Sequence, residues 1–501
     1  MVSLIGAGPG DPELITLKGL KRLRTADVVL YDRLSNDILL NECKQDCIKL
    51  FVGKEAGLHH VKQEDTIQML IEYAGQGLNV VRLKGGDPMI FGRGSEEAIE
   101  LKQAGIEFEI IPGITAALGA TAYAGIPVTH RNLVTKCLLV TAHEDPNKSD
   151  SQVNWKEIAQ LTNSTIVVYM GVGNMPSAAA KLIEYGMEAN TPVAIIENGT
   201  HNSQRTLTTR LIDTGKCISE NKIKPPAIFV ISPTVNLKNE IEWFENKPLF
   251  GRRIVATRAA DQVQSLSSKL TELGADVLNF NVIRTEQIMP PISFDSLKSK
   301  GYDWIVFTSE NGVRYFFNWL KSLNFDSRAL AEMKAAVIGS GTAERLSNYN
   351  ITADFMPAKY TSEAMLEEMP IQFKIDGTKF LRIKGDFEQD FLTDGLLKIG
   401  GEVDTVDVYR IIRDKPSVEL TDDLINYGCD AVTFTSKSTV VNFFETLGIE
   451  RAKTILHSAI AIAIGPVTAE ALISYGIENI VISDVHTING VIDTLKKTFQ
   501  K

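Results

Sequence analysis

The sequence predicts an α/β protein of at least two domains, each built on a largely parallel sheet covered by helices. With 501 residues, the chain is too long for a single hydrophobic core. Its first half repeats one pattern, a short apolar run that ends in a glycine-rich turn. Its second half is an internal duplication in which strand-like and helix-like segments alternate. Such alternation favours parallel strands with helices on both faces of the sheet.

Four glycine turns organise the first half. The apolar runs "VSLI", "VVRLK", "FEIIP" and "TIVVYM" end immediately before Gly6, Gly85, Gly113 and Gly171. Ligands of parallel α/β sheets bind at the carboxyl ends of the strands. The turns therefore predict four loops on one rim of one sheet, with a ligand among them.

The opening loop does not suit a dinucleotide. Gly6 and Gly8 match the first two glycines of a dinucleotide-binding loop, but Asp11 takes the place of the third. Pro9 has no N–H group to offer a phosphate, and the Asp11 carboxylate would repel one. We therefore expect a ligand without a pyrophosphate.

The next two loops favour a neutral or cationic nucleoside. "KGGDP" places Gly85 and Gly86, which allow close approach of a ligand, beside the carboxylate of Asp87. The segment Pro112–Pro127, "PGITAALGATAYAGIP", is rich in small residues that leave room for a flat ligand. The alternative is that these loops are only the tight turns of an α/β sheet.

A change of composition divides the chain near residues 245–250. The segment Asn236–Arg253 is charged at first and then turns through Pro248 and Gly251 into a new apolar run. We expect one domain over residues 1–245 and a second over residues 250–501.

The second domain contains two copies of one unit. The segment Phe307–Phe317, "FTSENGVRYFF", recurs as "FTSKSTVVNFF" at Phe434–Phe444. Likewise "IGSGTAERL" from Ile338 recurs as "IGPVTAEAL" from Ile464. We expect repeat units 251–376 and 377–501 that form two lobes with a cleft between them and exchange strands.

Charge and cysteine content exclude several classes of function. The net charge of −10 argues against binding to nucleic acid, which needs basic patches. No apolar stretch approaches the ~20 residues of a membrane span, so we expect no membrane partner. The five cysteines are few and scattered, and the spacing of Cys43 and Cys47 is more typical of a structural pair than of a metal site. We expect a cytoplasmic protein without a metal.

The first half resembles the uroporphyrinogen-III C-methyltransferases of the tetrapyrrole methylase superfamily. The resemblance covers about residues 1–240 and rests on motifs in the usual order: "LIGAGPGDPELITLKG", "YDRL", "VGK", "VVRLKGGDPMIFGRGSEE", "PGITAA", "AYAGIPVTHR" and "VYMG". It implies two α/β subdomains with a cleft, and a homodimer formed through this domain. It also implies transfer of methyl groups from S-adenosyl-L-methionine to C2 and C7 of uroporphyrinogen III, which gives precorrin-2.

The second half is similar to uroporphyrinogen-III synthase. The matching features are "TR" at Thr257–Arg258, the paired "FTS" and "IG" segments, and "VDVYR" at Val406–Arg410. The resemblance implies closure of hydroxymethylbilane to uroporphyrinogen III with inversion of ring D. The two activities would follow one another, because the synthase makes the substrate of the methyltransferase, in a route to cobalamin, sirohaem or a related product.

Motif positions imply residue roles in the first half. Asp32 is the candidate proton acceptor and Lys54 the candidate proton donor, needed because the methylated macrocycle loses a proton. The residues implied to bind the cofactor are Pro9, Gly85, Gly86, Asp87, Ile90, Thr115, Ala116, Met170, Gly199 and Ala227. The basic residues expected to bind substrate carboxylates are Arg33, Arg82, Lys84, Arg93, His130 and Arg131.

Fewer groups carry chemistry in the second half, because hydroxymethylbilane is itself reactive. Tyr409 is the candidate that donates a proton to the leaving hydroxyl; alternatively it is an ordinary strand aromatic. Residues at predicted strand ends that could bind carboxylates, or could simply cap helices, are Thr257, Arg258, Thr308, Ser309, Lys384, Ser436 and Thr468.

Two other functions remain open at this point. A methylase of the same fold could act on RNA or diphthine, although the acidic chain and the "YDRL" and "THR" motifs disfavour this. The duplicated half could instead be a ligand-binding module without catalysis, because bilobed α/β domains also serve as sensors.

Overall fold

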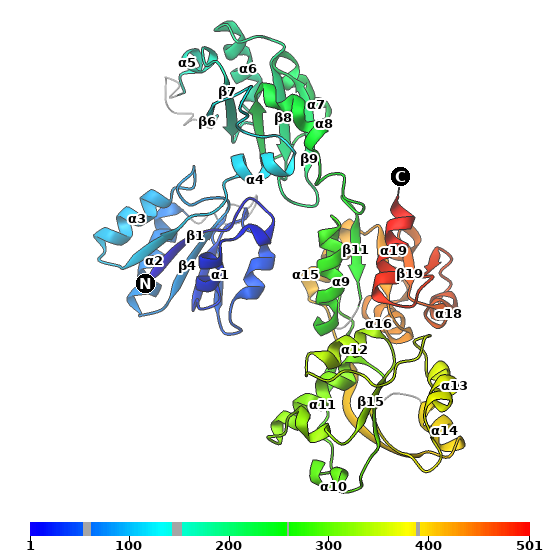
Figure 1. Cartoon of the computed structure of the whole chain (residues 1–501). Coiled ribbons are helices and arrows are strands. Elements are labelled where there is room, and N and C mark those ends of the chain that lie inside the picture. Colours follow the sequence, from blue (N-terminus) through cyan, green and yellow to red (C-terminus); the bar gives the residue numbers. More distant parts are fainter. Residues whose placement is uncertain (54–61, 143–152, 258–259, 387–390, 501) are drawn as a thin grey trace. The chain divides into compact units, whose positions relative to one another are not determined.

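The computed structural model describes residues 1–53, 62–142, 153–257, 260–386 and 391–500, and the side chains of 260–265 are not described. The chain divides into two compact units. The first unit comprises Met1–Arg252 with the short segments Leu270–Asp276 and Phe499–Lys501. The second comprises Arg253–Lys269 and Val277–Thr498. Figure 1 shows the strands and helices of both units.

The first unit begins with a five-stranded sheet in the order β3-β2-β4-β1-β5, and the strands pair in parallel. Each residue of β1, an interior strand of this sheet, is buried, since hydrophobic clusters cover both faces of the sheet. Its strands are β1 (Val2–Gly6), β2 (Val28–Tyr31), β3 (Ile48–Phe51), β4 (Val80–Lys84) and β5 (Phe108–Ile111). Its helices are α1 (Leu17–Leu23), α2 (Gln63–Gly75) and α3 (Gly94–Gln103).

A second sheet in the same unit has the order β6-β7-β10-β8-β9. Only β6 and β7 pair in parallel, and the other pairs are antiparallel. Its strands are β6 (Lys136–Thr141), β7 (Ser164–Tyr169), β8 (Pro192–Glu197), β9 (Arg205–Arg210) and β10 (Ala227–Ile231). The remaining helices are α4 (Ala116–Tyr123), α5 (Trp155–Ala159), α6 (Met175–Glu184), α7 (Thr214–Glu220) and α8 (Lys238–Ile241).

This second sheet corrects one prediction. Gly6, Gly85 and Gly113 follow strands β1, β4 and β5 of the first sheet, but Gly171 follows β7 of the second. The prediction of four loops on one rim is therefore wrong for the fourth loop. An apolar run followed by glycine identifies the end of a strand but carries no information about the sheet to which that strand belongs.

The second unit contains two five-stranded sheets, which define lobe I and lobe II. Lobe I has the order β12-β11-β18-β19-β20 and lobe II the order β13-β17-β16-β14-β15. The strands of lobe I are β11 (Arg253–Ala256), β12 (Asp276–Asn279), β18 (Ala431–Phe434), β19 (Ile460–Ala463) and β20 (Ile480–Ile482). Those of lobe II are β13 (Ile283–Gln287), β14 (Trp304–Phe307), β15 (Lys334–Val337), β16 (Lys379–Gly385) and β17 (Glu402–Arg413).

Helices flank both sheets of this unit. In chain order they are α9 (Ala260–Glu272), α10 (Phe294–Lys298), α11 (Glu310–Ser322), α12 (Ser340–Ser347), α13 (Ser362–Gln372), α14 (Phe391–Lys398), α15 (Val418–Tyr427), α16 (Lys437–Leu447), α17 (Ile449–Ser458), α18 (Pro466–Ser474) and α19 (Ile488–Phe499).

Each lobe combines strands from both halves of the duplication. Strand β11 pairs in parallel with β18, which lies far along the chain, and β14 pairs in parallel with β16. Backbone conformations also recur, since φ is +72° at both Gly251 and Gly377. The copies differ at one point: β12 and β13 are separate strands in the first, whereas the long β17 occupies the matching stretch of the second.

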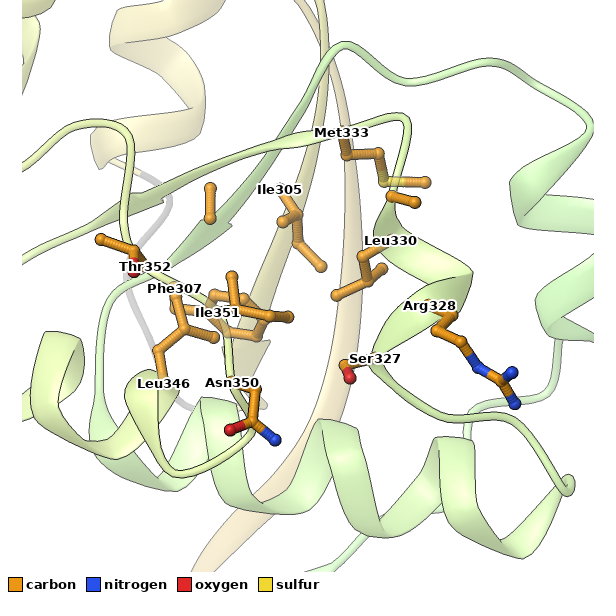
Figure 2. A pocket seen from close by; sticks show the side chains of 12 residues that line it. Ile305, Phe307, Ser327, Arg328, Leu330, Met333, Leu346, Asn350, Ile351 and Thr352 are labelled. Carbon is orange, nitrogen blue, oxygen red and sulfur yellow. The ribbon is translucent and has the colours of Figure 1, made fainter.

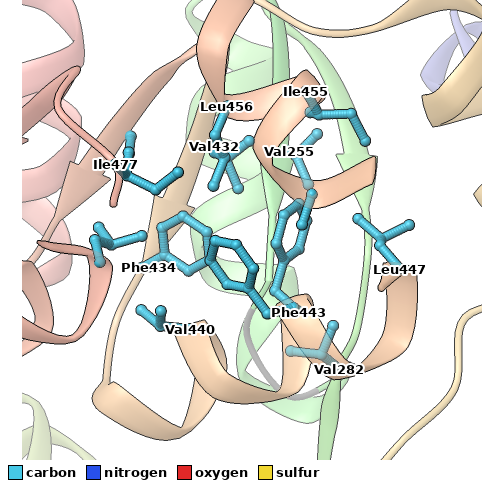
Figure 3. Close-up of a cluster of buried hydrophobic side chains, with 14 of the residues drawn as sticks. Val255, Val282, Val432, Phe434, Val440, Phe443, Leu447, Ile455, Leu456 and Ile477 are labelled. Atoms are coloured by element: carbon cyan, nitrogen blue, oxygen red, sulfur yellow. The ribbon is translucent and has the colours of Figure 1, made fainter. Parts of the chain in front are cut away.

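Aromatic residues from the duplicated "FTS…FF" segments fill the cores of both lobes. In lobe I the rings of Phe434 and Phe443 lie 5.4 Å apart edge to face (Figure 3). Phe280 also packs against Phe443. In lobe II Phe307 and Phe316 are placed in the same way, with ring centroids 5.5 Å apart. The segment that reveals the duplication therefore contributes to the core of each lobe. Its first phenylalanine ends β14 in one copy and β18 in the other, and polar residues follow.

Candidate functional site

Three glycines close the carboxyl edge of the first sheet. A Cβ atom added to Gly6 would lie 2.5 Å from Cα of Gly113 and 2.6 Å from the carbonyl oxygen of Gly86. Gly86 also exchanges backbone hydrogen bonds with Gly8, and its φ of +68° suits glycine. Three loops can meet this closely only without side chains, so they form a smooth backbone wall.

Tyr169 connects this edge to the second sheet. Its hydroxyl lies 2.6 Å from Oγ1 of Thr115 and accepts a hydrogen bond from the backbone N–H of Ala117 at 2.8 Å. Burial raises the pKa of Tyr169, so the hydroxyl stays protonated. The ring of Phe91, from the loop after β4, packs against Tyr169 with centroids 5.0 Å apart. The two sheet edges are therefore fixed to one another at the predicted cofactor loops.

The predicted cofactor residues lie on these two edges. Pro9, Gly85, Gly86, Asp87, Thr115 and Ala116 follow strands of the first sheet, and Ile90 is exposed in the loop after β4. Met170, Gly199 and Ala227 lie together on the second, because β10 pairs with the ends of β7 and β8. The Asp87 carboxylate accepts hydrogen bonds from the backbone N–H groups of Met89 and Gly113, so it shapes the wall itself.

We expect Tyr169→Phe to weaken the connection between the two edges. The change leaves the ring in place but removes the hydroxyl that pairs with Thr115 and Ala117, at a cost of about 1–3 kcal/mol in the free energy of unfolding. Denaturant unfolding of the variant would measure this. Tyr185→Phe, at an exposed tyrosine, is the matched control; equal stability of both variants would contradict the expectation.

Asp32 lies beside the glycine wall with its carboxylate held from several sides. Its Oδ1 atom accepts hydrogen bonds from the backbone N–H of Leu34 at 3.1 Å and of Gly85 at 3.4 Å, and from the Ser35 hydroxyl at 3.4 Å. Its Oδ2 atom lies 3.3 Å from a guanidinium nitrogen of Arg82. Asp32 is half-buried, so a bound molecule can reach a carboxylate whose direction the protein has already fixed.

Behind Asp32 lies a buried cluster of charges. Oε1 of Glu97, in the first turn of α3, accepts hydrogen bonds from Lys84 Nζ at 2.8 Å, Arg82 Nε at 3.3 Å and Gln63 Nε2 at 2.9 Å. Glu97 is 0% exposed, Lys84 4% and Arg82 5%. Burial, followed by the charge of Arg82, lowers the pKa of Lys84, and the Glu97 carboxylate opposes that shift.

Arg82 and Lys84, which the sequence predicts to bind substrate carboxylates, both belong to this buried cluster. Both side chains project from β4 toward α3, and their charged groups contact carboxylates of the chain itself. Among the other predicted basic residues, Arg33, Arg93 and Arg131 are exposed and His130 is half-buried. Arg93 pairs with Glu96, and Lys54 lies outside the described residues.

In lobe II, Tyr409 and Ser309 form a pair at the end of the sheet. The hydroxyls of the two residues lie 3.0 Å apart. Tyr409 is only 2% exposed, and its ring stacks on Tyr315 with centroids 5.6 Å apart. Ser309 is half-buried at the N-terminus of α11, where its Oγ accepts a hydrogen bond from the N–H of Gly312. Tyr409 therefore has little direct access to a ligand, whereas Ser309, within hydrogen-bond distance of its hydroxyl, is more accessible.

The other residues predicted for the second half are divided between the lobes. Thr257 is buried in lobe I and donates its hydroxyl to the carbonyl oxygen of Thr433, and Thr468 is buried in α18. Ser436 caps α16, as the alternative reading of its spacing predicted. In lobe II, Thr308 is half-buried, and Lys384 Nζ lies 3.7 Å from a carboxylate oxygen of Asp407. Arg258 lies outside the described residues.

A pocket of about 370 Å³ lies elsewhere in lobe II. Figure 2 shows it between β14, β15 and the segment around Asn350, with Ile305, Phe307 and Leu330 directed into it. None of the predicted site residues lines it. Its lining combines apolar residues with the polar side chains of Ser327, Arg328, Asn350 and Thr352, and Arg328 pairs with Asp326.

Two features are absent from the part of the chain that the structure describes. None of the helices there combines the length and apolar character that crossing a bilayer requires. Within the same residues, no three His, Cys, Asp or Glu side chains gather as a potential metal site.

The site contains residues that the sequence analysis missed. Tyr169 lies inside the quoted motif "VYMG" and Glu97 inside "FGRGSEE", yet neither was assigned a role. The spacing of Arg82 and Lys84 on one strand face was a usable signal for Glu97, because two adjacent buried cations require an anion. For Tyr169 no such signal existed, since its partner Thr115 is distant in sequence.

Comparison with known proteins gives matches to both halves. The family model Tetrapyrrole (Corrin/Porphyrin) Methylases matches residues 1–213, and the model Uroporphyrinogen-III synthase HemD matches residues 264–493. A relative from Ruminiclostridium josui, "Porphyrin biosynthesis protein HemD", is 35% identical over 502 residues, covering 99% of this chain and 97% of the relative. "Uroporphyrinogen-III C-methyltransferase" of Bacillus subtilis (strain 168) is 39% identical over 355 residues, covering 70% and 73%.

A solved structure also aligns with the first half. It is uroporphyrin-III C-methyl transferase from Thermus thermophilus complexed with S-adenyl homocysteine, and it is 33% identical with a TM-score of 0.40. The alignment covers 47% of this chain and 93% of that one.

Proposed function

Because this chain belongs to the family in which a tetrapyrrole methylase is joined to a uroporphyrinogen-III synthase, we propose that its first half methylates uroporphyrinogen III at C2 and C7. The methyl donor is S-adenosyl-L-methionine and the product is precorrin-2. One observation carries this proposal: the Asp32 carboxylate accepts a hydrogen bond from Gly85 at the glycine wall, so a proton acceptor lies beside the proposed cofactor loops.

The residues at the two edges fit S-adenosyl-L-methionine. Gly6, Gly86 and Gly113 provide a wall that a flat nucleoside can approach closely, and a Cβ at Gly6 or Gly113 would force the loops of this wall apart. Met170, which is exposed at the end of β7, and Ala227 would contact the base. When bound, the cofactor supplies a methyl group on a sulfonium, which is a good leaving group.

The chain's own residues then have two tasks. They align the pyrrole carbon with the methyl group, and they remove the proton that the methylated macrocycle must lose. Arg33, Arg93, His130 and Arg131 bind the carboxylates of the substrate, because they are the predicted basic residues with accessible side chains. Asp32 takes up the proton, and the guanidinium of Arg82, 3.3 Å from its Oδ2 atom, holds the carboxylate in place.

For the second half we propose the closure of hydroxymethylbilane with inversion of ring D. Tyr409 donates a proton through the Ser309 hydroxyl to the leaving hydroxyl of the substrate, which departs as water. Thr308 and Lys384 lie beside one another, because Phe307 of β14 pairs with Ile383 of β16, and both bind substrate carboxylates. Lys384 is 7% exposed and lies 3.7 Å from Asp407, so it exchanges this partner for the substrate. We further propose that the protein works in the cytoplasm as a homodimer formed through its first half.

The test of both activities uses the full chain. With hydroxymethylbilane alone, we expect uroporphyrinogen III rather than the uroporphyrinogen I that forms spontaneously. With S-adenosyl-L-methionine added, mass spectrometry should detect a product that carries two further methyl groups. Uroporphyrinogen I as the only cyclic product would contradict the synthase assignment, and a product without added methyl groups would contradict the methylase assignment.

We expect Tyr409→Phe to slow the synthase by roughly 100-fold or more, because a general acid contributes about 10²–10⁴ to a rate. Ser309→Ala should have a similar effect, since the two hydroxyls lie 3.0 Å apart. The ratio of uroporphyrinogen III to uroporphyrinogen I measures both. Tyr427→Phe, at an exposed tyrosine of α15, is the control, and a wild-type ratio in Tyr409→Phe would exclude the proposed proton donor.

A further inference from the structure

We propose that Glu97 is a positioning residue for proton transfer during methylation, because it holds Arg82 and thereby fixes the Asp32 carboxylate. This inference rests on the proposed function of the first half. Glu97 itself is 0% exposed and does not reach a bound substrate. Its influence on the reaction passes through the guanidinium group of Arg82.

The hydrogen bonds around Arg82 define the connection. Its Nε atom faces Glu97 Oε1 at 3.3 Å, and its terminal nitrogens face Asp32 Oδ2 at 3.3 Å and the carbonyl oxygens of Leu30 and Leu83. The planar guanidinium therefore meets one carboxylate on each side. Glu97 occupies the Nε atom of the guanidinium. Asp32 therefore contacts only one terminal nitrogen of Arg82 and does not form a two-point ion pair with it.

The cluster costs stability, which favours a role in the reaction. Oε2 of Glu97 is buried without a hydrogen-bond partner among the described residues, although Oε1 of the same carboxylate has three. Buried ion clusters are often no more stable than apolar side chains of the same volume. A cluster of this kind directly behind the proposed proton acceptor is better explained by control of that acceptor.

Removal of the Glu97 charge should make the Asp32 carboxylate a weaker base. Among the described residues, the charged groups near Asp32 are Arg82 and Lys84 on β4, Glu97 on α3 and the adjacent, exposed Arg33, while Arg93 and Glu96 pair with one another. Without the negative charge of Glu97, the surroundings of Asp32 become more positive. Arg82 is also free to pair fully with Asp32, so the carboxylate becomes a weaker base.

The test compares Glu97→Gln with wild type in the methylation of uroporphyrinogen III by the full chain. We expect kcat to fall roughly 10- to 100-fold while KM stays within about twofold, because the step affected follows binding. The acid limb of the pH profile of kcat should move to lower pH, since a more positive environment lowers the pKa of a carboxylate. A purely structural role would leave this limb in place.

Controls separate the inference from folding and from the proposed function. Glu100→Gln makes the same change at an exposed position of α3 and should behave as wild type, and binding of S-adenosylhomocysteine should be equal in all variants. If Glu97→Gln does not fold, the double variant Lys84→Met/Glu97→Gln restores the charge balance and should show the same loss of kcat. Wild-type kcat and acid limb in a folded variant would overturn the inference, whereas a wild-type enzyme that does not methylate would overturn the proposed function instead.

Discussion

Asp32→Asn abolishes most methylation, with an expected fall in kcat of roughly 10²–10⁴-fold. The amide keeps the size of the side chain and can still accept hydrogen bonds from Leu34 and Gly85, but it cannot take up a proton. The loss should therefore appear in kcat, while affinity for S-adenosylhomocysteine stays close to that of wild type. Steady-state rates with uroporphyrinogen III and calorimetric titration measure the two quantities.

The synthase half provides an internal control for Asp32→Asn. Asp32 belongs to the first compact unit, and the residues proposed for the synthase belong to the second. The rate of uroporphyrinogen III formation should therefore be unchanged. Parallel loss of both activities would show that the variant is damaged as a whole, and full methylation would exclude Asp32 as the proton acceptor.

Gly113→Ala eliminates cofactor binding and destabilises the first unit. The added methyl group would lie 2.6 Å from Cα of Gly6 and would also overlap the Gly86 carbonyl oxygen, so the backbone of two loops must move. Overpacking of this kind costs about 1–3 kcal/mol, and backbone atoms give way less readily than side chains. We expect no measurable binding of S-adenosylhomocysteine and a lower free energy of unfolding.

Gly75→Ala is the matched control. Gly75 is part of α2, and a Cβ at this position would meet nothing within 4 Å. Because alanine is the better helix former, this variant should be more stable by about 0.5–1 kcal/mol and bind the cofactor normally. Normal binding by Gly113→Ala would show that the cofactor does not use the wall formed by the three glycines.

The sequence predicted much of the fold because its signals were local or repeated. Apolar runs before Gly6, Gly85 and Gly113 identified three adjacent strand ends, and the duplicated "FTS" segments identified the lobes' core strands. Pairing between strands was harder to predict. The antiparallel order around β10 depends on contacts between residues distant along the chain, and no periodicity records them.

The candidate site was predicted unevenly for a related reason. The glycines could be proposed for the site from their small size at strand ends, and Asp32 from the resemblance of its "YDRL" motif. Arg82 and Lys84 were assigned to the substrate because a basic side chain suggests an anionic ligand. Because side chains alternate along a strand, the sequence places both residues on one face of β4. It does not predict that α3 packs on this face and brings Glu97 into contact with them.

The position of the cofactor relative to Asp32 is the most direct test of the proposed methylation chemistry. A crystal structure of the full chain with S-adenosylhomocysteine should show the nucleoside against Gly6, Gly86 and Gly113, with its sulfur facing the side on which the Asp32 carboxylate lies. Binding of NAD or ATP at this wall in place of S-adenosylhomocysteine, or a cofactor bound away from it, would contradict the proposal.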